Sequence, residues 1–369
     1  MRIWLAPSAF FPHSGGVEEL TLKLGQHLQR RGHDVLVVVH RHPADLPAQA
    51  VVEGLPVRRV SFPTAGRRPG RVLAVGRDHR RVQAELSALD RPDLVHIQCP
   101  SNQTLPIALF TRRTSTPLVL TSQGEIVMDA DRIYQRSRYL RQSLRFGTRQ
   151  AAALTACSRW TAEQAARIAP TFATARSVPN GVDPGDWSMA PVPVEPVFCC
   201  WGRHVPQKGL DLAIEAFGQA RARLPGARLL VGGDGPERSR LAALAGPGVE
   251  FLGPLDRGGV RAMLQSARVA IVPSRVEPFG IVALEALAAG RSLVYSRTAG
   301  GLPEAVGDRG RGVDPADTTA FAHALVGAAV DPVDAEGNAA YAASFSWDAI
   351  TEQYAEIYAT VIRTPAHKR

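Results

Sequence analysis

The chain has 369 residues, and at roughly 150 residues per domain this length predicts two or three domains and excludes one small module. Hydrophobic residues make up 45% and charged residues 21%, which is typical of globular proteins and excludes disordered and fibrous classes. The net charge of +9 is carried almost entirely by arginine, since Lys23, Lys208 and Lys368 are the only lysines.

Membrane insertion and export are not expected from this sequence. No apolar run approaches the roughly 20 residues of a transmembrane helix, and the amino terminus lacks the apolar stretch of a secretory signal. The four cysteines show no C-x-x-C spacing, which favours free, buried thiols over disulfides or structural zinc. We therefore expect a cytoplasmic protein.

Strand-like apolar runs alternate with helical patterns through the first half of the chain. We expect a helix at 17–28, from Val17, Leu20, Leu24 and Leu28, and strands at 2–6, 34–39, 94–97, 118–121 and 153–156. Alternation of this kind predicts a parallel sheet wrapped by helices.

The alternation stops in the proline-rich segment 184–196, which we interpret as a linker, and then begins again. The second series predicts strands at 197–201, 228–231, 249–252, 269–272 and 292–296, with helices at 211–222 and 281–289. We therefore predict two doubly wound α/β domains, 1–185 and 186–346, whose strand ends face a central ligand cleft. A terminal amphipathic helix is expected from residue 347.

Three strand-to-helix loops carry candidate binding residues. The first contains Gly15 and Gly16 ahead of a helix, where free backbone N–H groups favour an anion; a plain glycine turn explains the pattern equally well. The second contains Arg203 and Lys208, a cation pair suited to a leaving phosphate. Its alternative is a helix-entry loop with solvated charges.

The third loop and its helix contain two carboxylates, Glu277 and Glu285. Glu285 lies on an apolar helix, where burial is costly unless the carboxylate accepts hydrogen bonds, for example from sugar hydroxyls. A salt bridge to an arginine is the alternative. Backbone N–H groups from Gly280 to Val282 again suit a phosphate, whereas the glycines at 232–236 lack the G-x-G-x-x-G spacing of dinucleotide sites.

Taken in order, these motifs resemble glycosyltransferase family 4, which implies the GT-B fold and retaining transfer from a nucleotide sugar. The resemblance covers nearly the whole chain, with these matching segments: Gly15-Gly16, Gly32-His33-Asp34-Val35, Val178-Pro179-Asn180-Gly181-Val182-Asp183, Gly202-Arg203, Lys208-Gly209, Gly233-Asp234-Gly235-Pro236, Phe251-Leu252-Gly253, Pro273-Ser274, Glu277 to Glu285 and Gly300-Gly301-Leu302-Pro303-Glu304.

The resemblance implies a role for each candidate residue. Arg203 and Lys208 are expected to bind the donor diphosphate and stabilise its leaving charge, and Glu277 to face the donor sugar. The further donor contacts implied are Gly15, Gly16, Gly235, Phe279, Gly280, Ile281, Val282 and Glu285. It also implies that no metal or other cofactor is needed and that the terminal helix, 347–369, packs back on the first domain.

One departure concerns the acceptor side. Relatives commonly carry Thr-x-His-Gly where this chain has Thr121-Ser122-Gln123-Gly124. Because an amide exchanges no proton near neutral pH, we assign Gln123 to binding rather than acid–base chemistry. Gly124, Glu125, Asp129 and His96 are further candidates for acceptor or sugar contacts, although a lone histidine such as His96 is more often structural.

Two arginine-rich stretches lie in the first domain, at 58–81 and 132–149. The second is amphipathic and fits peripheral association with an anionic membrane, with a solvated helix face as the slightly favoured alternative. No nucleic-acid-binding module accompanies the charge, so nucleic acid is not an expected partner.

The leading hypothesis is transfer of a hexose from a nucleoside-diphosphate sugar to an acceptor hydroxyl on a lipid, glycan or natural product. Two rivals stay open, a nucleotide-sugar 2-epimerase of the same fold and a non-catalytic sugar-nucleotide-binding subunit. A complete leaving-group site, with Arg203, Lys208, Glu277 and Glu285, argues against the second rival, because binding alone does not require it.

Overall fold

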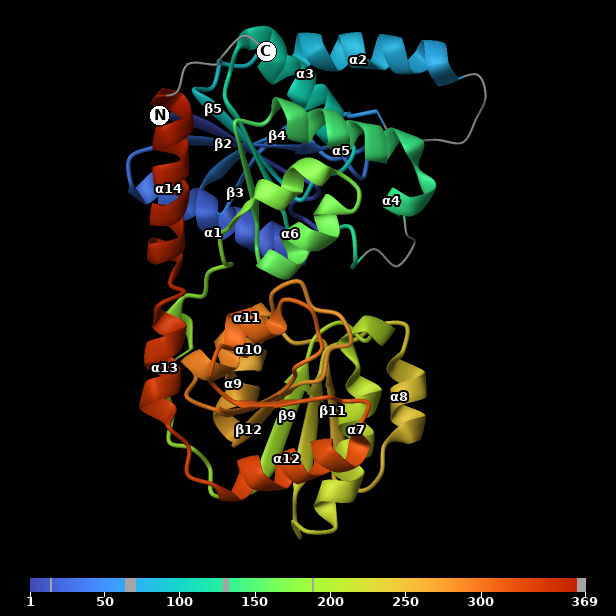
Figure 1. Cartoon of the computed structure of the whole chain (residues 1–369), viewed down its shortest axis with the longest axis vertical. Helices are drawn as coiled ribbons and strands as arrows, with labels where there is room; N and C mark the ends of the chain where they lie inside the picture. The colour runs from blue at the N-terminus through green and yellow to red at the C-terminus, as the bar shows by residue number, and fades with distance from the viewer. Residues whose placement is uncertain (14, 64–70, 129–132, 188, 364–369) are drawn as a thin grey trace. The chain divides into compact units, whose positions relative to one another are not determined.

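The computed structural model describes residues 1–13, 15–63, 71–128, 133–187 and 189–363. The chain forms two compact units, the first made of Met1–Val178 with Trp347–Arg369 and the second of Pro179–Ser346. Each unit is a sheet of mainly parallel strands with helices packed against it (Figure 1).

The sheet of the first unit has the spatial order β3-β4-β2-β1-β5-β6-β7-β8, with only the β3–β4 pair antiparallel. Its strands are β1 (Arg2–Pro7), β2 (Asp34–His40), β3 (Gln49–Val52), β4 (Leu55–Val60), β5 (Leu94–Gln98), β6 (Leu118–Ser122), β7 (Ala153–Ala156) and β8 (Arg176–Ser177). All five strands expected in this half are confirmed.

The hairpin of β3 and β4 was not predicted. Its two-residue turn, Glu53 and Gly54, has φ values of 47° and 85°. Two-residue hairpin turns whose twist matches that of the strands need a positive φ at both residues. Asn-Gly and Asp-Gly are the usual residues in such turns. Because Glu53 stands at the first position, the turn signal is weak in the sequence.

The helices of the first unit are α1 (Gly16–Arg30), α2 (Arg71–Ser87), α3 (Thr104–Thr114), α4 (Ile133–Arg136), α5 (Arg138–Gln150), α6 (Arg159–Ala166) and α14 (Trp347–Arg363), with a 3₁₀ turn η1 (Pro170–Thr174). α14 comes from the far end of the chain and lies beside α1 (Figure 1). The ring of His27 on α1 is 2.8 Å from the carboxylate of Asp348 on α14. Residues 364–369 lie outside the described part.

The sheet of the second unit is wholly parallel, in the order β11-β10-β9-β12-β13-β14. Its strands are β9 (Val197–Trp201), β10 (Arg228–Gly232), β11 (Val249–Gly253), β12 (Val269–Val272), β13 (Ser292–Ser296) and β14 (Arg311–Val313). Its helices are α7 (Leu210–Arg221), α8 (Arg238–Leu244), α9 (Arg257–Ser266), α10 (Ile281–Ala288), α11 (Leu302–Val306), α12 (Thr318–Val330) and α13 (Ala335–Ala343), with 3₁₀ turns η2 (Pro184–Asp186) and η3 (Pro206–Lys208). The predicted strands and helices of this half are present.

The segment expected to be a linker packs on the second unit. Trp187 is buried under the guanidinium of Arg257, 5.6 Å from the ring centre, and Arg291 donates to the carbonyl of Ala190 at 2.7 Å. The division between the units falls after Val178, ahead of the boundary expected at residue 185. Prolines interrupt the helical pattern here, but the buried indole holds the segment in place.

Each unit buries its own apolar core. Trp4 stacks on Phe110 at 5.1 Å in the first unit, and the rings of Phe198 and Phe217 meet edge to face at 5.7 Å in the second. All four cysteines are buried and none forms a disulfide, as expected. Among the helices of the described residues, none is long and apolar enough to cross a membrane.

The strand order fixes where ligands are expected. In the first unit the order reverses between β1 and β5, and in the second between β9 and β12. Loops leaving the carboxyl ends of such strand pairs diverge to opposite faces of the sheet and leave a crevice, which is where open α/β sheets bind ligands. Most of the candidate residues follow these strands directly.

Candidate functional site

In the second unit, Lys208 and Glu277 come together at the strand-order reversal. Lys208 ends the turn after β9, and Glu277 lies in the loop after the neighbouring strand β12. The ammonium Nζ of Lys208 donates to Oε2 of Glu277 at 2.6 Å, and Ser274 lies 3.4 Å from the same oxygen. Glu277 is 7% exposed while the Lys208 side chain is 21% exposed, so the cation retains an open side.

A second contact, which the sequence did not suggest, ties the same two loops together. The backbone N–H of Arg275 donates to the carbonyl of Gln207, and its guanidinium donates to both oxygens of Asp211 at 2.8 Å. Burial opposes ionisation of Asp211, but the hydrogen bonds from Arg275 and Arg240 outweigh it and hold the pKa of that carboxyl below its usual value. Asp211 thus fixes the loop carrying Lys208 against the loop carrying Glu277.

The loops after β9 and β10 touch through their backbones, which explains two of the glycines. A Cβ atom on Gly233 would lie 2.0 Å from the carbonyl oxygen of Gly202, and one on Gly235 would lie 2.6 Å from that of His204. The N–H of His204 donates to the carbonyl of Asp234 at 2.8 Å. Gly235, expected to contact the donor, is therefore required by packing of the Arg203 loop.

The remaining donor-side candidates follow Glu277 into α10. Gly280 precedes the helix with a φ of 101°, and a Cβ there would lie 2.4 Å from Leu302. Phe279 is buried, its ring 6.1 Å from that of Phe345. Ile281, Val282 and Glu285 are half-buried along α10. At the start of α10 the N–H of Ala283 donates to the carbonyl of Gly280 at 2.9 Å, whereas those of Ile281 and Val282 have no partner within the helix.

Arg203 differs from Lys208 in its surroundings. Its side chain is exposed, and within the described part of the chain it takes no part in an ion pair. Of the two cations, Lys208 is therefore held by a carboxylate, and Arg203 is an exposed side chain outside any ion pair of the described residues. Among the described residues, no cluster of three or more His, Cys, Asp or Glu side chains is placed to hold a metal ion.

In the first unit, Gly15 and Gly16 begin α1 after β1 and are exposed. A Cβ on Gly15 would lie 2.8 Å from a carboxylate oxygen of Glu18, which is itself 8% exposed. Glu18 was not singled out in the sequence, although a carboxylate in a helix's first turn favours the positive end of the helix dipole. The tertiary structure places the Glu18 carboxylate beside Gly15.

The end of β6 places Gln123, Gly124 and Glu125 in one tight turn. The carboxylate of Glu125 accepts the hydroxyl of Ser122 at 2.9 Å and the backbone N–H of Gln123 at 2.8 Å. Burial raises the pKa of Glu125 to about 7, against the opposing effect of these hydrogen bonds. Cys99, at the end of the neighbouring strand β5, lies next to this carboxylate and was not expected there. Asp129 lies outside the described residues.

His96 is placed in the core rather than at a ligand site. The side chain is fully buried on β5, with one ring nitrogen 2.7 Å from the hydroxyl of Tyr358 and the other 2.6 Å from that of Thr121. Burial lowers the pKa of His96 to about 3, so the ring is neutral. Both nitrogens are occupied, and the expected acceptor contact is corrected to a structural link between β5, β6 and α14.

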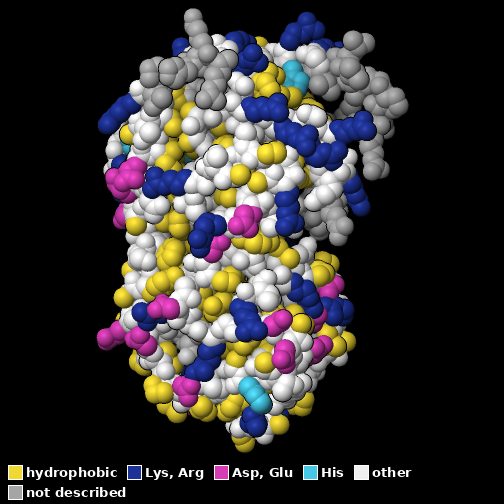
Figure 2. Space-filling view, in the orientation of Figure 1, with side chains coloured by type: hydrophobic (Ala, Val, Ile, Leu, Met, Phe, Trp, Pro, Cys, Tyr) yellow, Lys and Arg dark blue, Asp and Glu magenta, His cyan; other side chains and the backbone are white. Residues whose placement is uncertain are grey.

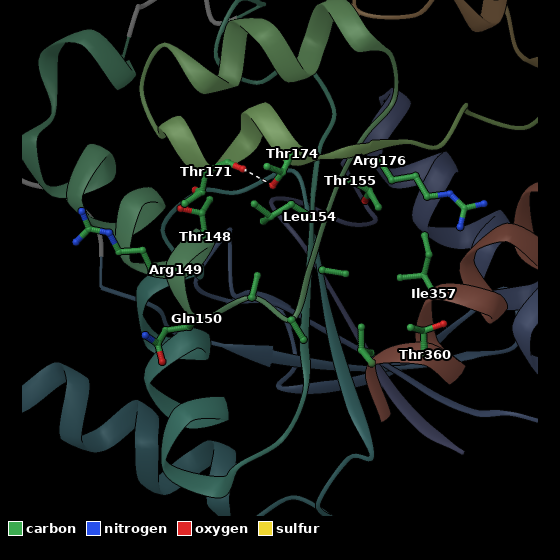
Figure 3. A pocket seen from close by; sticks show the side chains of 14 residues that line it. Thr148, Arg149, Gln150, Leu154, Thr155, Thr171, Thr174, Arg176, Ile357 and Thr360 are labelled. Atoms are coloured by element: carbon green, nitrogen blue, oxygen red, sulfur yellow. Dashed lines mark hydrogen bonds between the residues drawn. The ribbon is translucent and has the colours of Figure 1, made fainter. Parts of the chain in front are cut away.

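A pocket of about 800 Å³ lies elsewhere in the first unit (Figure 3). It is lined by the end of α5, the start of β7, η1 and the last turns of α14, including Arg149, Leu154, Arg176 and Thr360. The start of β7 is at the opposite edge of the sheet from the carboxyl strand ends. The pocket contains none of the expected site residues.

Comparison with known proteins identifies the family of this chain. The model of the Glycosyl transferase 4-like domain matches residues 15–181, and that of Glycosyl transferases group 1 matches residues 195–331. The chain belongs to glycosyltransferase family 4. The Lys208–Glu277 pair lies within the second match and the Gln123–Glu125 turn within the first.

Relatives of this family 4 chain include two mycobacterial enzymes. It is 29% identical over 389 residues to the phosphatidyl-myo-inositol mannosyltransferase of Mycolicibacterium smegmatis, covering 98% of this chain and 94% of the relative. It is 34% identical over 206 residues to a glycogen synthase of Mycobacterium tuberculosis, where the match spans 51% of this chain and 49% of the relative.

Solved structures show that the family 4 chain has the GT-B fold. Sucrose-phosphate synthase from Thermosynechococcus elongatus matches with a TM-score of 0.76 at 21% identity, covering 98% of both chains. The structure of Anabaena Alr3699/HepE in complex with UDP-glucose matches with a TM-score of 0.72 at 19% identity, covering 98% of this chain and 100% of that one.

Proposed function

We propose that the protein is a retaining hexosyltransferase that uses a nucleoside-diphosphate sugar. The observation that carries this proposal is the Lys208–Glu277 pair at the strand-order reversal of the second unit. A cation held by a buried carboxylate, next to the N–H groups of Ile281 and Val282 that begin α10, is suited to a sugar linked to a diphosphate.

In the proposed reaction, the bond between the anomeric carbon and the diphosphate oxygen breaks, and its electron pair stays on the diphosphate. The acceptor hydroxyl forms the new carbon–oxygen bond on the same face of the sugar, and its proton passes to a leaving phosphate oxygen. Lys208 and Arg203 stabilise the charge that develops on that phosphate. Glu277 fixes the Lys208 ammonium and faces the donor sugar.

The donor site is proposed to work without a metal ion. Two cationic side chains and the start of α10 supply the positive charge that a divalent cation supplies in other sugar-nucleotide sites. Glu285, half-buried one turn into α10, is proposed to bind the donor ribose. In support of a nucleotide sugar, a solved structure of the same fold is a complex with UDP-glucose.

The acceptor is proposed to bind at the carboxyl strand ends of the first unit, through Gln123, Gly124 and Glu125. The side-chain amide of Gln123 is suited to a hydroxyl group, and the Glu125 carboxylate holds the turn that carries it. The full-length relative from M. smegmatis is named for transfer to phosphatidyl-myo-inositol. Inositol and its phospholipid are therefore the first acceptors to test.

Peripheral association with an anionic membrane is proposed for the basic face of α5. Two of its arginines are engaged within the unit, since Arg141 donates to the carbonyl of Tyr134 and Arg145 to that of Ile168, both at 2.9 Å. Arg138 and Arg149 remain, both exposed, on a unit whose visible face carries many basic side chains (Figure 2). Sedimentation with phosphatidylglycerol vesicles should fall in the variant Arg138→Gln/Arg149→Gln and with added salt.

A melting-temperature panel of UDP, GDP, ADP and dTDP sugars, without added metal, tests the donor proposal. A ligand at 100 times its dissociation constant adds about 2.7 kcal/mol of stability, which is a visible shift. The responding donor is then incubated with phosphatidylinositol vesicles, free myo-inositol or no acceptor. No shift with any nucleotide refutes the donor site, and an isomerised nucleotide sugar formed without acceptor supports a 2-epimerase instead.

A further inference from the structure

The end of β6 is held by a hydrogen-bonded turn that depends on one carboxylate. The two oxygens of Glu125 accept from two different donors, Oε1 from the hydroxyl of Ser122 and Oε2 from the backbone N–H of Gln123. Gly124, between them, has a φ of 95°, which lets the chain turn back sharply. We call this arrangement the Glu125 clasp.

The clasp is suited to an ionised Glu125. A carboxylate offers lone pairs on both oxygens, whereas a protonated carboxyl turns one oxygen into a donor. The Cys99 thiol at the end of β5 lies against this carboxylate, and the Glu18 carboxylate of α1 acts on the same thiol. Among the described residues no Lys, Arg or His side chain contributes to holding Glu125 ionised. Hydrogen bonds from the backbone N–H groups of Glu125 and Gln123, from the Ser122 hydroxyl and from the Cys99 thiol favour the charged form against burial.

The residue held by the clasp has an unused polar group. The side-chain oxygen of Gln123 is shielded from solvent and has no hydrogen-bond partner among the described residues. A buried polar atom without a partner costs free energy, and a ligand that pairs with it recovers that cost. Gln123 follows β6 directly, at the sheet edge where ligands are expected.

We propose that Glu125 is a positioning residue, whose carboxylate holds the backbone of Gln123 so that its side-chain amide binds the acceptor, and whose protonation releases that amide. The proposal rests on the transferase function proposed above. It predicts that the acceptor presents an uncharged hydroxyl at this point, because the Glu125 carboxylate would repel a phosphate. It also predicts that acceptor binding weakens as the pH falls through about 7, where the pKa of Glu125 is placed by burial.

The first experiment observes the clasp directly. The amide proton of Gln123, assigned by NMR, should shift between pH 5.5 and 8.5 with a midpoint near 7, since its acceptor changes charge. In Glu125→Gln this titration should disappear, while in Glu163→Gln, which alters an exposed carboxylate on α6, it should persist. An amide of Gln123 that does not titrate in the wild-type protein overturns the proposal.

The second experiment measures what the clasp does. With phosphatidylinositol vesicles and free myo-inositol as acceptor probes, Glu125→Gln should lose roughly 10- to 100-fold in kcat/KM for the acceptor, the effect of losing a hydrogen bond to a charged group. In Glu125→Gln the fall in kcat/KM below pH 7 should be absent. In Glu125→Asp part of the lost kcat/KM should be recovered. The melting shift given by the donor should be unchanged.

The outcomes separate this proposal from the proposed function. If Glu125→Gln keeps the wild-type fall in kcat/KM below pH 7, the positioning role of Glu125 is overturned, and the proposed transferase function is unaffected. A wild-type protein that shows neither a nucleotide shift nor transfer refutes the transferase, and the acceptor role of Gln123 falls with it.

Discussion

The ammonium of Lys208 lies 2.6 Å from a carboxylate oxygen of Glu277, although 69 residues separate them in the chain. Their loops leave the adjacent parallel strands β9 and β12, at the point where the strand order of the second unit reverses. A lysine alone would be mobile, and a buried glutamate alone would be costly. Together they form a fixed cation with an open side, on which a leaving phosphate can bind.

Removing either cation should slow turnover far more than it weakens the fold. We expect Lys208→Ala and Arg203→Ala to lose on the order of 10²–10³ in kcat, as for removal of a group aimed at developing charge. The matched control is Arg223→Ala, an exposed arginine of the same unit. Initial rates with saturating donor provide the measurement, and near-normal turnover in both variants would refute the leaving-group assignment.

The glycine at 233 should tolerate no side chain. Its φ is 110°, and an added Cβ would lie 2.0 Å from the Gly202 carbonyl oxygen, so Gly233→Ala strains the backbone and displaces the loop carrying Arg203. We expect a loss of about 1–3 kcal/mol in the free energy of unfolding. Gly218→Ala, in α7 with open space around it, should instead stabilise by about 0.4–1 kcal/mol. Urea titrations of both variants check this contrast, which equal effects would contradict.

The hydroxyl of Tyr358 on the terminal helix α14 should contribute to the free energy of unfolding. Tyr358→Phe removes the partner of a His96 ring nitrogen and leaves that nitrogen buried without a hydrogen bond, which costs about 1–3 kcal/mol. Thr351→Val is the control on the same helix, because the Thr351 hydroxyl is buried and has no partner among the described residues. That change should be neutral or stabilising. Melting curves that rank the two variants in the opposite order would show that the His96 contact contributes nothing.

Glu125 should also give the free energy of unfolding a specific pH dependence. Its pKa in the folded protein is raised from 4.5 to about 7, so the folded state binds the proton more tightly than the unfolded one. The stability that this contributes is fully present below about pH 4.5 and is lost as the pH rises through about 7. Between pH 5 and pH 8, the wild-type protein should therefore lose on the order of 1–3 kcal/mol more than Glu125→Gln. Urea titrations at several pH values measure the difference, and parallel profiles would exclude the raised pKa.

The sequence by itself determined the alternating strands and helices of both halves, because apolar periodicity and glycine stops are local properties of the chain. It also indicated Lys208 and Glu277, since a rare lysine and a carboxylate each stood in a strand-to-helix loop. It did not reveal the β3–β4 hairpin, whose turn begins with Glu53 rather than Asn or Asp. Local signals fail where the turn residue is unusual.

Tertiary structure decided which of those residues meet. His96 carried the same kind of sequence signal as the site residues, yet α14, more than 250 positions away, covers it and occupies a ring nitrogen with Tyr358. Cys99 gave no signal and was brought to Glu125 by the order of the strands, since β5 lies next to β6. Burial, pKa and partnership depend on contacts between distant segments. A linear pattern therefore predicts the elements and candidate residues of this protein, while the packing of its sheets assigns each residue to a site or to the core.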